Sequence, residues 1–177
     1  MTKVNISKTT TMDEIQNAWP TAKEFLFQKY HLGGCSSCAF HPDESLEQVL
    51  LRADVTDVDA AIAELSATRD NYFETLIDPA ELEDLRQKDG LKLVDVRQEE
   101  EQQLVSISGS IPATQELVEE MQSWPRDATI VLYCHMGDKS PEAGSYLRAE
   151  HGFTNVKTLR GGINAWSKEI DPFIPIY

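Results

Sequence analysis

Short apolar runs alternate with amphipathic stretches over residues 72–177. The run at 91–96 fits a strand that is buried on both faces. Asp78, Pro79 and Glu81 supply the N-cap, the first-turn proline and the capping-box glutamate of a helix. Strands that alternate with helices predict an α/β fold, with a mostly parallel sheet covered by helices on both faces. The predicted strands are 91–96, 128–133 and 156–159, and the predicted helices are 78–88, 98–103, 113–123, 141–150 and 163–168.

The first seventy residues predict a small all-helical domain. Thr11 and Glu14 form a capping box before one helix, and the apolar spacing at 22–29 predicts a second. The boundary of this domain is expected around residues 67–71, which gives two domains, 1–70 and 71–177. Two further helices follow from apolar residues at helical spacing, namely Leu46, Val49 and Leu50 for one, and Val58, Ala61, Ile62 and Leu65 for the other.

The segment 131–140 joins an apolar run to a helix start through a short polar stretch. Ser140 is the expected N-cap, with Pro141 at the first helical position. Cys134 then lies on a tight loop, where backbone N–H groups and a helix N-terminus favour negative charge on its sulfur. Such an environment favours the nucleophilic thiolate, so Cys134 is the predicted reactive residue. A small core residue is the alternative for a cysteine at a strand end, but Gly137 allows the tight turn that a reactive loop needs.

A thiol phosphatase also holds its cysteine on a loop between a strand and a helix. Phosphatases need an arginine six positions after the cysteine, because a planar guanidinium binds phosphate through two parallel hydrogen bonds. That position is Ser140 in this chain, and Lys139 before it is only a point charge. Phosphoryl chemistry is therefore disfavoured.

Four stretches together resemble the single-domain rhodaneses, a family of sulfurtransferases, in the family's order and approximate spacing. Two departures bear on the choice of sulfur donor. The histidine usual before the glycine turn is absent, with Val105 and Ser106 in its region, and Lys139 stands where many members have arginine. The four stretches are the Asp-Val-Arg signature at 93–97, the glycine turn before a proline at 107–112, the active loop at 134–140 and the Leu-x-Gly-Gly-x-x-x-Trp stretch at 159–166.

The resemblance implies a cysteine persulfide on Cys134, without a cofactor. It implies that Asp95 and Arg97 brace the fold near the active loop, and that Gly161, Gly162 and Trp166 serve turn formation and packing. The residues expected to bind the sulfur donor are the rest of the loop, namely His135, Met136, Gly137, Asp138, Lys139 and Ser140.

The chain is strongly acidic, with 30 acidic against 16 basic residues and a net charge of −14 over 177 residues. This balance disfavours nucleic acid and anionic membranes as partners, because binding to either depends on basic patches. The N-terminus lacks the apolar core of a signal peptide, and no run approaches the length of a membrane span. We therefore expect a cytoplasmic protein whose 3 cysteines are catalytic or metal-binding rather than joined in disulfides.

Cys35 and Cys38 form a Cys-x-x-Cys motif after paired glycines in the predicted helical domain. The favoured interpretation is a redox or sulfur-relay dithiol. With His31 and His41 the pair also offers four zinc or iron ligands, although structural zinc sites usually separate their ligand pairs by roughly ten residues or more, and we assign no metal. A purely structural loop is the third alternative. The domain resembles a small bacterial helical family of unknown function whose members carry cysteines after a helix.

The predicted function is sulfur transfer. Cys134 would take a sulfane sulfur from a donor such as thiosulfate, and a thiol or cyanide would accept it. His135 and Lys139 would attract the anionic donor. The expected partners are a small sulfur-donor anion and a thiol acceptor, with a redox protein as a further candidate, and neither nucleic acid nor membrane. The alternative is a rhodanese-like sensing or docking module whose N-terminal dithiol or metal site is the active part, but a cysteine in an intact loop favours the enzyme.

Overall fold

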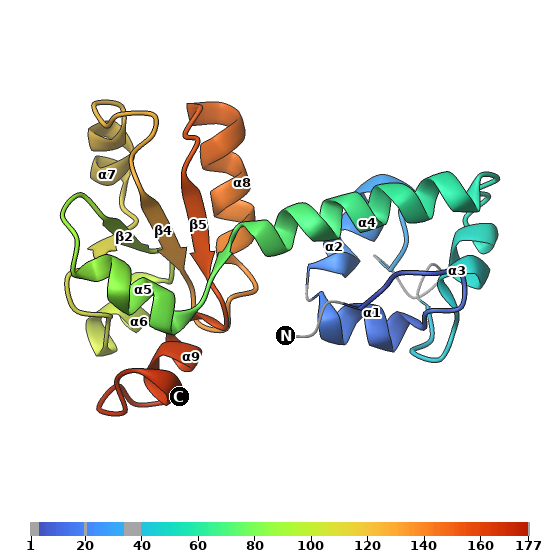
Figure 1. Ribbon diagram of the computed structural model, residues 1–177, viewed down its shortest axis with the longest axis horizontal. Coiled ribbons are helices and arrows are strands. Elements are labelled where there is room, and N and C mark those ends of the chain that lie inside the picture. The colour runs from blue at the N-terminus through green and yellow to red at the C-terminus, as the bar shows by residue number, and fades with distance from the viewer. Residues whose placement is uncertain (1–3, 20, 34–39, 177) are drawn as a thin grey trace. The chain divides into compact units, whose positions relative to one another are not determined.

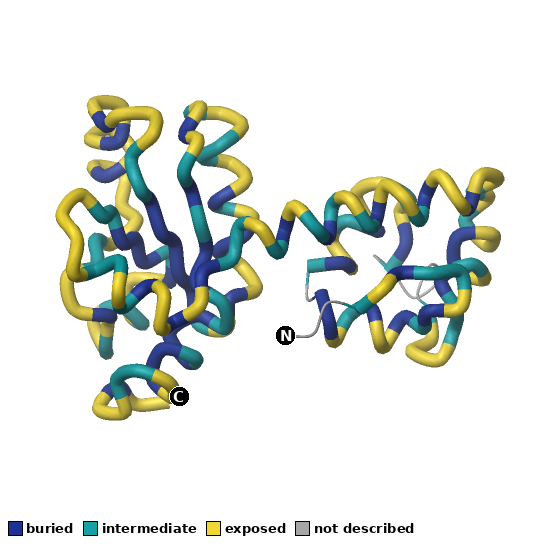
Figure 2. Tube along the Cα trace, in the orientation of Figure 1, coloured by how far each residue is buried: buried dark blue, intermediate teal, exposed yellow. Residues whose placement is uncertain are grey.

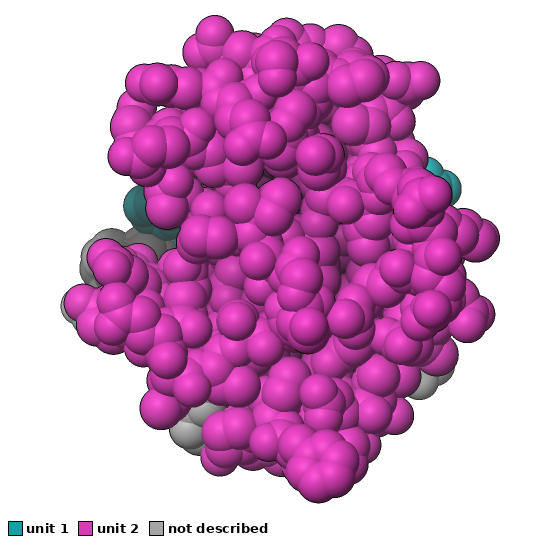
Figure 3. All heavy atoms as spheres, turned by 90° about the vertical axis from the view of Figure 1, so that its left-hand side faces the viewer, with its two compact units in different colours: residues 1–74 teal, residues 75–177 magenta. Residues whose placement is uncertain are grey.

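The chain forms two compact units in the computed structural model, which describes residues 4–19, 21–33 and 40–176. Figure 3 shows the surface of the C-terminal unit in magenta. The N-terminal unit comprises residues 1–74 and the C-terminal unit residues 75–177. The sequence placed the boundary around residues 67–71. That segment lies inside a continuous helix, α4 (Val58–Glu74), and the division falls where the helix ends.

The described part of the N-terminal unit is built from helices. Thr11 Oγ1 accepts the N–H of Glu14, and the Glu14 carboxylate accepts the N–H of Thr11, so the predicted capping box is confirmed. Ser45 and Gln48 form a second capping box. The helices are α1 (Met12–Ala18), α2 (Ala22–Tyr30), α3 (Leu46–Arg52) and α4, and their buried apolar residues include Met12, Ile15, Leu26, Leu46, Val49, Leu50 and Leu65.

The C-terminal unit is an α/β fold around a parallel sheet with the strand order β1-β5-β4-β2-β3 (Figure 1). A helix follows each strand along the chain. The predicted fold class, a parallel sheet flanked by helices with a small N-terminal all-α domain, is confirmed. The strands are β1 (Leu76–Ile77), β2 (Lys92–Asp95), β3 (Ile111–Pro112), β4 (Ile130–Tyr133) and β5 (Val156–Leu159), and the helices are α5 (Pro79–Arg86), α6 (Glu99–Leu104), α7 (Gln115–Met121), α8 (Ser140–His151) and α9 (Gly162–Glu169).

Side chains of the central strand β4 alternate between two apolar cores, one on each face of the sheet. Val131 and Tyr133 belong to a core with residues of α5 and α9, and Ile130 and Leu132 to a core with residues of α7 and α8. All of β4 is therefore buried, as expected for a parallel strand covered on both faces (Figure 2). The next residue, Cys134, is the first residue of the following loop and is still buried, at only 2% exposed.

Strands β1 and β3 are not among the predicted elements. Each has two residues, too few to show a periodic pattern, and each is defined by parallel pairing, of Leu76 with Thr158 and of Ile111 with Val94. Asp78 is the N-cap of α5, but its side chain makes no capping hydrogen bond. The predicted capping box there is wrong, because the Asp78 carboxylate pairs with Arg160 instead. No helix within the described ranges is both long and apolar enough to cross a membrane.

Candidate active site

Cys134 follows β4 directly and opens residues 134–140, which we call the Cys134 loop. Its Sγ accepts hydrogen bonds from the backbone N–H groups of Gly137 at 3.2 Å, Lys139 at 3.4 Å and Ser140 at 3.4 Å. Lys139 and Ser140 are the N-cap and the first residue of α8, so two of these donors belong to a helix N-terminus. Three N–H dipoles thus point at one buried sulfur, a geometry that favours negative charge there.

The start of α9 holds the Cys134 loop in place. Ile163 N–H donates to the Cys134 carbonyl at 2.9 Å, and Asn164 N–H donates to the His135 carbonyl at 3.2 Å. Gly162 has a positive φ of 59°, and a Cβ on it would overlap both of these carbonyl oxygens. A side chain at position 162 is therefore excluded by the close approach of α9 to the loop.

The structure confirms the tight turn expected at Gly137 but not the N-cap expected at Ser140. Gly137 has a φ of 83°, the positive value that its position in a tight loop predicted, and a Cβ there would lie 2.7 Å from the Gly161 nitrogen. The N-cap of α8, however, is Lys139 and not Ser140. Ser140 is the first residue of α8, its N–H donates to the Cys134 sulfur, and its buried Oγ lies 3.6 Å from that sulfur.

The exposed Asp138 places its carboxylate beside the Cys134 sulfur. Its Oδ1 lies 3.5 Å from Cys134 Sγ and also accepts the Lys139 N–H at 3.0 Å. A protonated Cys134 can donate its S–H to this oxygen, whereas an ionised sulfur and the carboxylate repel each other. The sequence placed Asp138 among the donor-binding residues without indicating that its carboxylate faces the sulfur.

Side chains of α6 and α9, from outside the predicted site, also contact the Cys134 loop. Glu101 Oε1 of α6 lies 3.2 Å from His135 Nδ1, and Asn164 Nδ2 of α9 donates to Met136 Sδ at 2.8 Å. Met136 is 56% exposed and Lys139 is also exposed. Glu101 and Asn164 stand 34 and 28 residues from their partners along the chain, so no local sequence pattern links them to the loop.

Asp95 and Arg97 form a buried ion pair where β2 ends, with Arg97 Nη2 at 2.6 Å from Asp95 Oδ2. Arg97 Nη2 also donates to the Val105 carbonyl at 2.7 Å. Asp95 Oδ2 accepts the hydroxyl of Tyr133 at 2.8 Å, and burial raises the pKa of Tyr133 above its ordinary value. These contacts join β2 to β4 and to the end of α6, which supports the bracing role expected for the pair.

The sequence model of the rhodanese-like domain matches residues 78–169. The chain belongs to the rhodanese-like domain family. The matched range contains the Asp-Val-Arg signature, the Cys134 loop and the paired glycines before α9, so the resemblance seen in the sequence is confirmed for this part. The N-terminal unit lies outside the match, and its resemblance to a small helical family stays a prediction.

Several proteins are similar to this rhodanese-like domain. A probable adenylyltransferase/sulfurtransferase MoeZ of Mycobacterium tuberculosis is 37% identical over 105 residues, covering 57% of this chain and 26% of that protein. The adenylyltransferase and sulfurtransferase MOCS3-1 of Zea mays is 33% identical over 93 residues, covering 48% and 20%. The chain thus spans about a quarter or less of these relatives. A rhodanese-related protein of Thermoplasma volcanium is 28% identical, covering 53% of this chain and 91% of that one, with a TM-score of 0.44.

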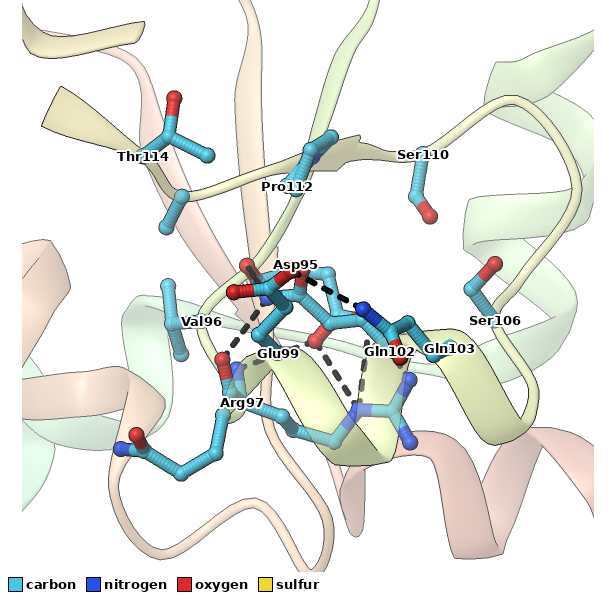
Figure 4. Close-up of a pocket in the computed structure, with 12 residues that line it drawn as sticks. Asp95, Val96, Arg97, Glu99, Gln102, Gln103, Ser106, Ser110, Pro112 and Thr114 are labelled. Carbon is cyan, nitrogen blue, oxygen red and sulfur yellow. Dashed lines mark hydrogen bonds and ion pairs between the residues drawn. The ribbon is translucent and has the colours of Figure 1, made fainter. Parts of the chain in front are cut away.

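The rhodanese-like domain also has a pocket of about 730 Å³ at the carboxyl ends of β2 and β3 (Figure 4). Thr114, Pro112 and Ser110 lie on one side, opposite Arg97 and the residues of α6. Cys134 is not among the lining residues, so we do not assign sulfur transfer to this pocket. The lining residues are Asp95, Val96, Arg97, Gln98, Glu99, Gln102, Gln103, Ser106, Ser110, Pro112, Ala113 and Thr114.

Cys35 and Cys38 lie outside the residues that the structure describes, so their predicted roles stay predictions. His31 ends α2 as its C-cap, in the left-handed conformation, and the exposed His41 lies 3.4 Å from Asp43. Within the described parts of the chain, no group of three or more histidine, cysteine, aspartate or glutamate side chains is placed to hold a metal ion. Cys134 is a free, buried thiol.

Proposed function

We propose that this chain is a sulfurtransferase in which Cys134 takes a sulfane sulfur from a donor such as thiosulfate and passes it to a thiol or cyanide. The observation that carries the proposal is the convergence of the Gly137, Lys139 and Ser140 N–H groups on the Cys134 sulfur. Membership of the rhodanese-like domain family and the sulfurtransferase names of the relatives support it.

In the first half of the reaction, the Cys134 thiolate attacks the outer sulfur of thiosulfate. A bond forms between the two sulfurs, the bond within thiosulfate breaks, and sulfite leaves with the electron pair. Cys134 is then a persulfide, and its outer sulfur carries the negative charge. In the second half, a thiol or cyanide attacks that outer sulfur and restores the Cys134 thiolate.

In both halves of the reaction, the Cys134 loop stabilises an anionic sulfur. Cys134 is 2% exposed, so the loop N–H dipoles act in an environment from which water is largely excluded. The dipoles are held by the α9 contacts to the Cys134 and His135 carbonyls, and they need no rearrangement when charge appears on sulfur. Exposed Lys139 would add long-range attraction for an anionic donor.

The test replaces the reactive atom. Cys134→Ser keeps the size of the side chain and cannot hold a persulfide, so thiocyanate formation from thiosulfate and cyanide is expected to vanish while the melting temperature is retained. Thiosulfate should add the mass of one sulfur to the wild-type protein. The matched control is the Cys35→Ser, Cys38→Ser variant, which should still gain that mass. Turnover by Cys134→Ser, or a sulfur mass that disappears with Cys35 and Cys38, would refute the assignment.

A further inference from the structure

Asp138 is an unusual neighbour for a sulfur that has to carry negative charge. Its Oδ1 lies 3.5 Å from Cys134 Sγ, about as close as the backbone donors of the loop. The carboxylate and the sulfur also share one donor, because Lys139 N–H lies 3.0 Å from Asp138 Oδ1 and 3.4 Å from Sγ. The carboxylate thus competes with the sulfur for one of its three stabilising dipoles and adds a negative charge of its own.

The other charges around the Cys134 loop do not cancel this carboxylate. His135 is paired with Glu101, whose Oε1 is 3.2 Å from His135 Nδ1, so any positive charge on the ring is already offset. The Asp95–Arg97 ion pair is neutral as a whole. Asp138 and Lys139 are both exposed, so solvent screens both charges, but Asp138 Oδ1 lies 3.5 Å from the Cys134 sulfur. The field at Cys134 therefore combines N–H dipoles with the partly screened negative charge of Asp138.

We propose that Asp138 is a specificity-determining residue that disfavours dianionic sulfur donors and leaves those with a single negative charge as the preferred class, such as thiosulfonates and thiol-bound persulfides. The inference rests on the proposed sulfur transfer through Cys134. Repulsion grows with the product of the charges. A dianion that approaches the sulfur therefore pays about twice the penalty of a monoanion for the same carboxylate at the same distance.

Two donors isolate this effect because they react by the same step. With thiosulfate, the Cys134 thiolate takes the outer sulfur and sulfite leaves as a dianion. With methanethiosulfonate, the thiolate takes the outer sulfur and methanesulfinate leaves as a monoanion. In each case one S–S bond forms on Cys134, one S–S bond of the donor breaks with its electron pair on the leaving group, and the total charge is conserved. Both donors leave the same Cys134 persulfide, and cyanide accepts its outer sulfur.

The experiment measures kcat/KM for both donors in wild type and in Asp138→Asn, at low ionic strength. The amide is nearly isosteric, and its Oδ1 can still accept the Lys139 N–H, so only the charge is lost. Any effect on the Cys134 thiolate itself is common to both donors and cancels in their ratio. We expect the thiosulfate to methanethiosulfonate ratio of kcat/KM to rise about tenfold in Asp138→Asn, and to rise less at high salt.

Asp89→Asn is the matched control, because it removes one exposed carboxylate from the turn before β2, at the end of the strand away from Cys134. Its ratio should equal that of the wild type. Asp138→Ser, which also loses the charge, should show the same shift as Asp138→Asn and replaces it if the amide variant fails to fold. An unchanged ratio in a folded Asp138 variant, with both donors active, would overturn the role of Asp138 and leave the proposed function standing. A wild-type protein that forms no persulfide with either donor would overturn the proposed function itself.

Discussion

The hydroxyl of Tyr133 donates to Asp95 Oδ2 at 2.8 Å and thereby joins the last residues of β4 and β2, one position before Cys134. The same hydroxyl oxygen accepts the Ile107 N–H at 3.2 Å and lies 2.9 Å from Ser110 Oγ. One buried phenol therefore connects two strand ends and the glycine turn before β3. Because Tyr133 directly precedes Cys134, this network anchors the residue from which the Cys134 loop starts.

Tyr133→Phe should lower the free energy of unfolding by about 1–3 kcal/mol, because it leaves the Ile107 N–H and part of the Asp95 carboxylate without a buried partner. Burial raises the pKa of Tyr133 in the folded protein above the ordinary value of 10.0. Above pH 10 the unfolded state loses the Tyr133 proton, whereas the folded state retains it. The contribution of the Tyr133 hydroxyl to stability is therefore complete below pH 10 and is lost as the pH rises above it.

Denaturant unfolding between pH 8 and pH 11 measures this difference. The gap in stability between wild type and Tyr133→Phe should narrow above pH 10 and stay constant below it. The pKa of Tyr30 is also raised by burial, so the wild-type decline persists in part in the variant. A gap that stays constant to pH 11 would show that Tyr133 ionises in the fold as readily as in the unfolded chain.

Arg97→Met should destabilise the C-terminal unit by about 3–5 kcal/mol, because it leaves the buried Asp95 carboxylate without its cation. The double variant Asp95→Asn, Arg97→Met removes both charges and should recover part of this loss. Chemical unfolding measures the free energies of unfolding. Persulfide formation per folded molecule then shows whether Arg97 only stabilises the fold or also contacts the substrate. If the folded fraction of Arg97→Met reacted much more slowly than wild type, Arg97 would have a role in the reaction as well as in the fold.

Gly162→Ala should disrupt the Cys134 loop, because its Cβ would overlap the Cys134 and His135 carbonyl oxygens at a positive φ. We expect a loss of about 2 kcal/mol or more and a marked drop in persulfide formation. Gly152→Ala is the control, since Gly152 has a similar φ of 69° and open space around the Cβ position. Equal losses in the two variants would mean that backbone strain alone, and not the loop contact, is the cause.

Lys139→Ala should raise KM for thiosulfate more than it lowers kcat, because the ammonium group acts by attracting the donor. The increase should shrink at higher salt, since exposed charges are screened beyond roughly 10 Å at 0.1 M ionic strength. Lys88→Ala, an exposed lysine before β2, controls for the change in net charge. If KM at low salt did not change, the loop N–H groups would be sufficient to recruit the donor.

The Cys35 and Cys38 dithiol, predicted from the sequence, should accelerate decay of the Cys134 persulfide. One cysteine takes the sulfur, and the other displaces it as sulfide while a disulfide closes. The persulfide should therefore last longer in the Cys35→Ser, Cys38→Ser variant, with less sulfide released. Stoichiometric zinc or iron that is lost in His31→Ala and His41→Ala would instead favour the metal interpretation. Equal decay without bound metal would leave the motif with neither role.

Local patterns in the sequence were sufficient to place Cys134 on a loop between a strand and a helix and to find most of the elements around it. The range 156–159 predicted for the last strand is that of β5, and the capping box of Thr11 and Glu14 forms as expected. The apolar run before Cys134 and Pro141 after it bracket the loop within a few residues. Such features rest on interactions between neighbours in the chain, which side-chain type and spacing largely decide.

Tertiary structure decided the features that depend on partners far apart in sequence. Strands β1 and β3 exist only through pairing with β5 and β2. Arg160, 82 residues away, takes the Asp78 carboxylate that would otherwise cap α5. Glu101 reaches His135 only because α6 and the Cys134 loop follow adjacent strands of the sheet. These contacts join residues that only the packing of the sheet and its helices brings together, and the periodicity of the sequence does not encode that packing.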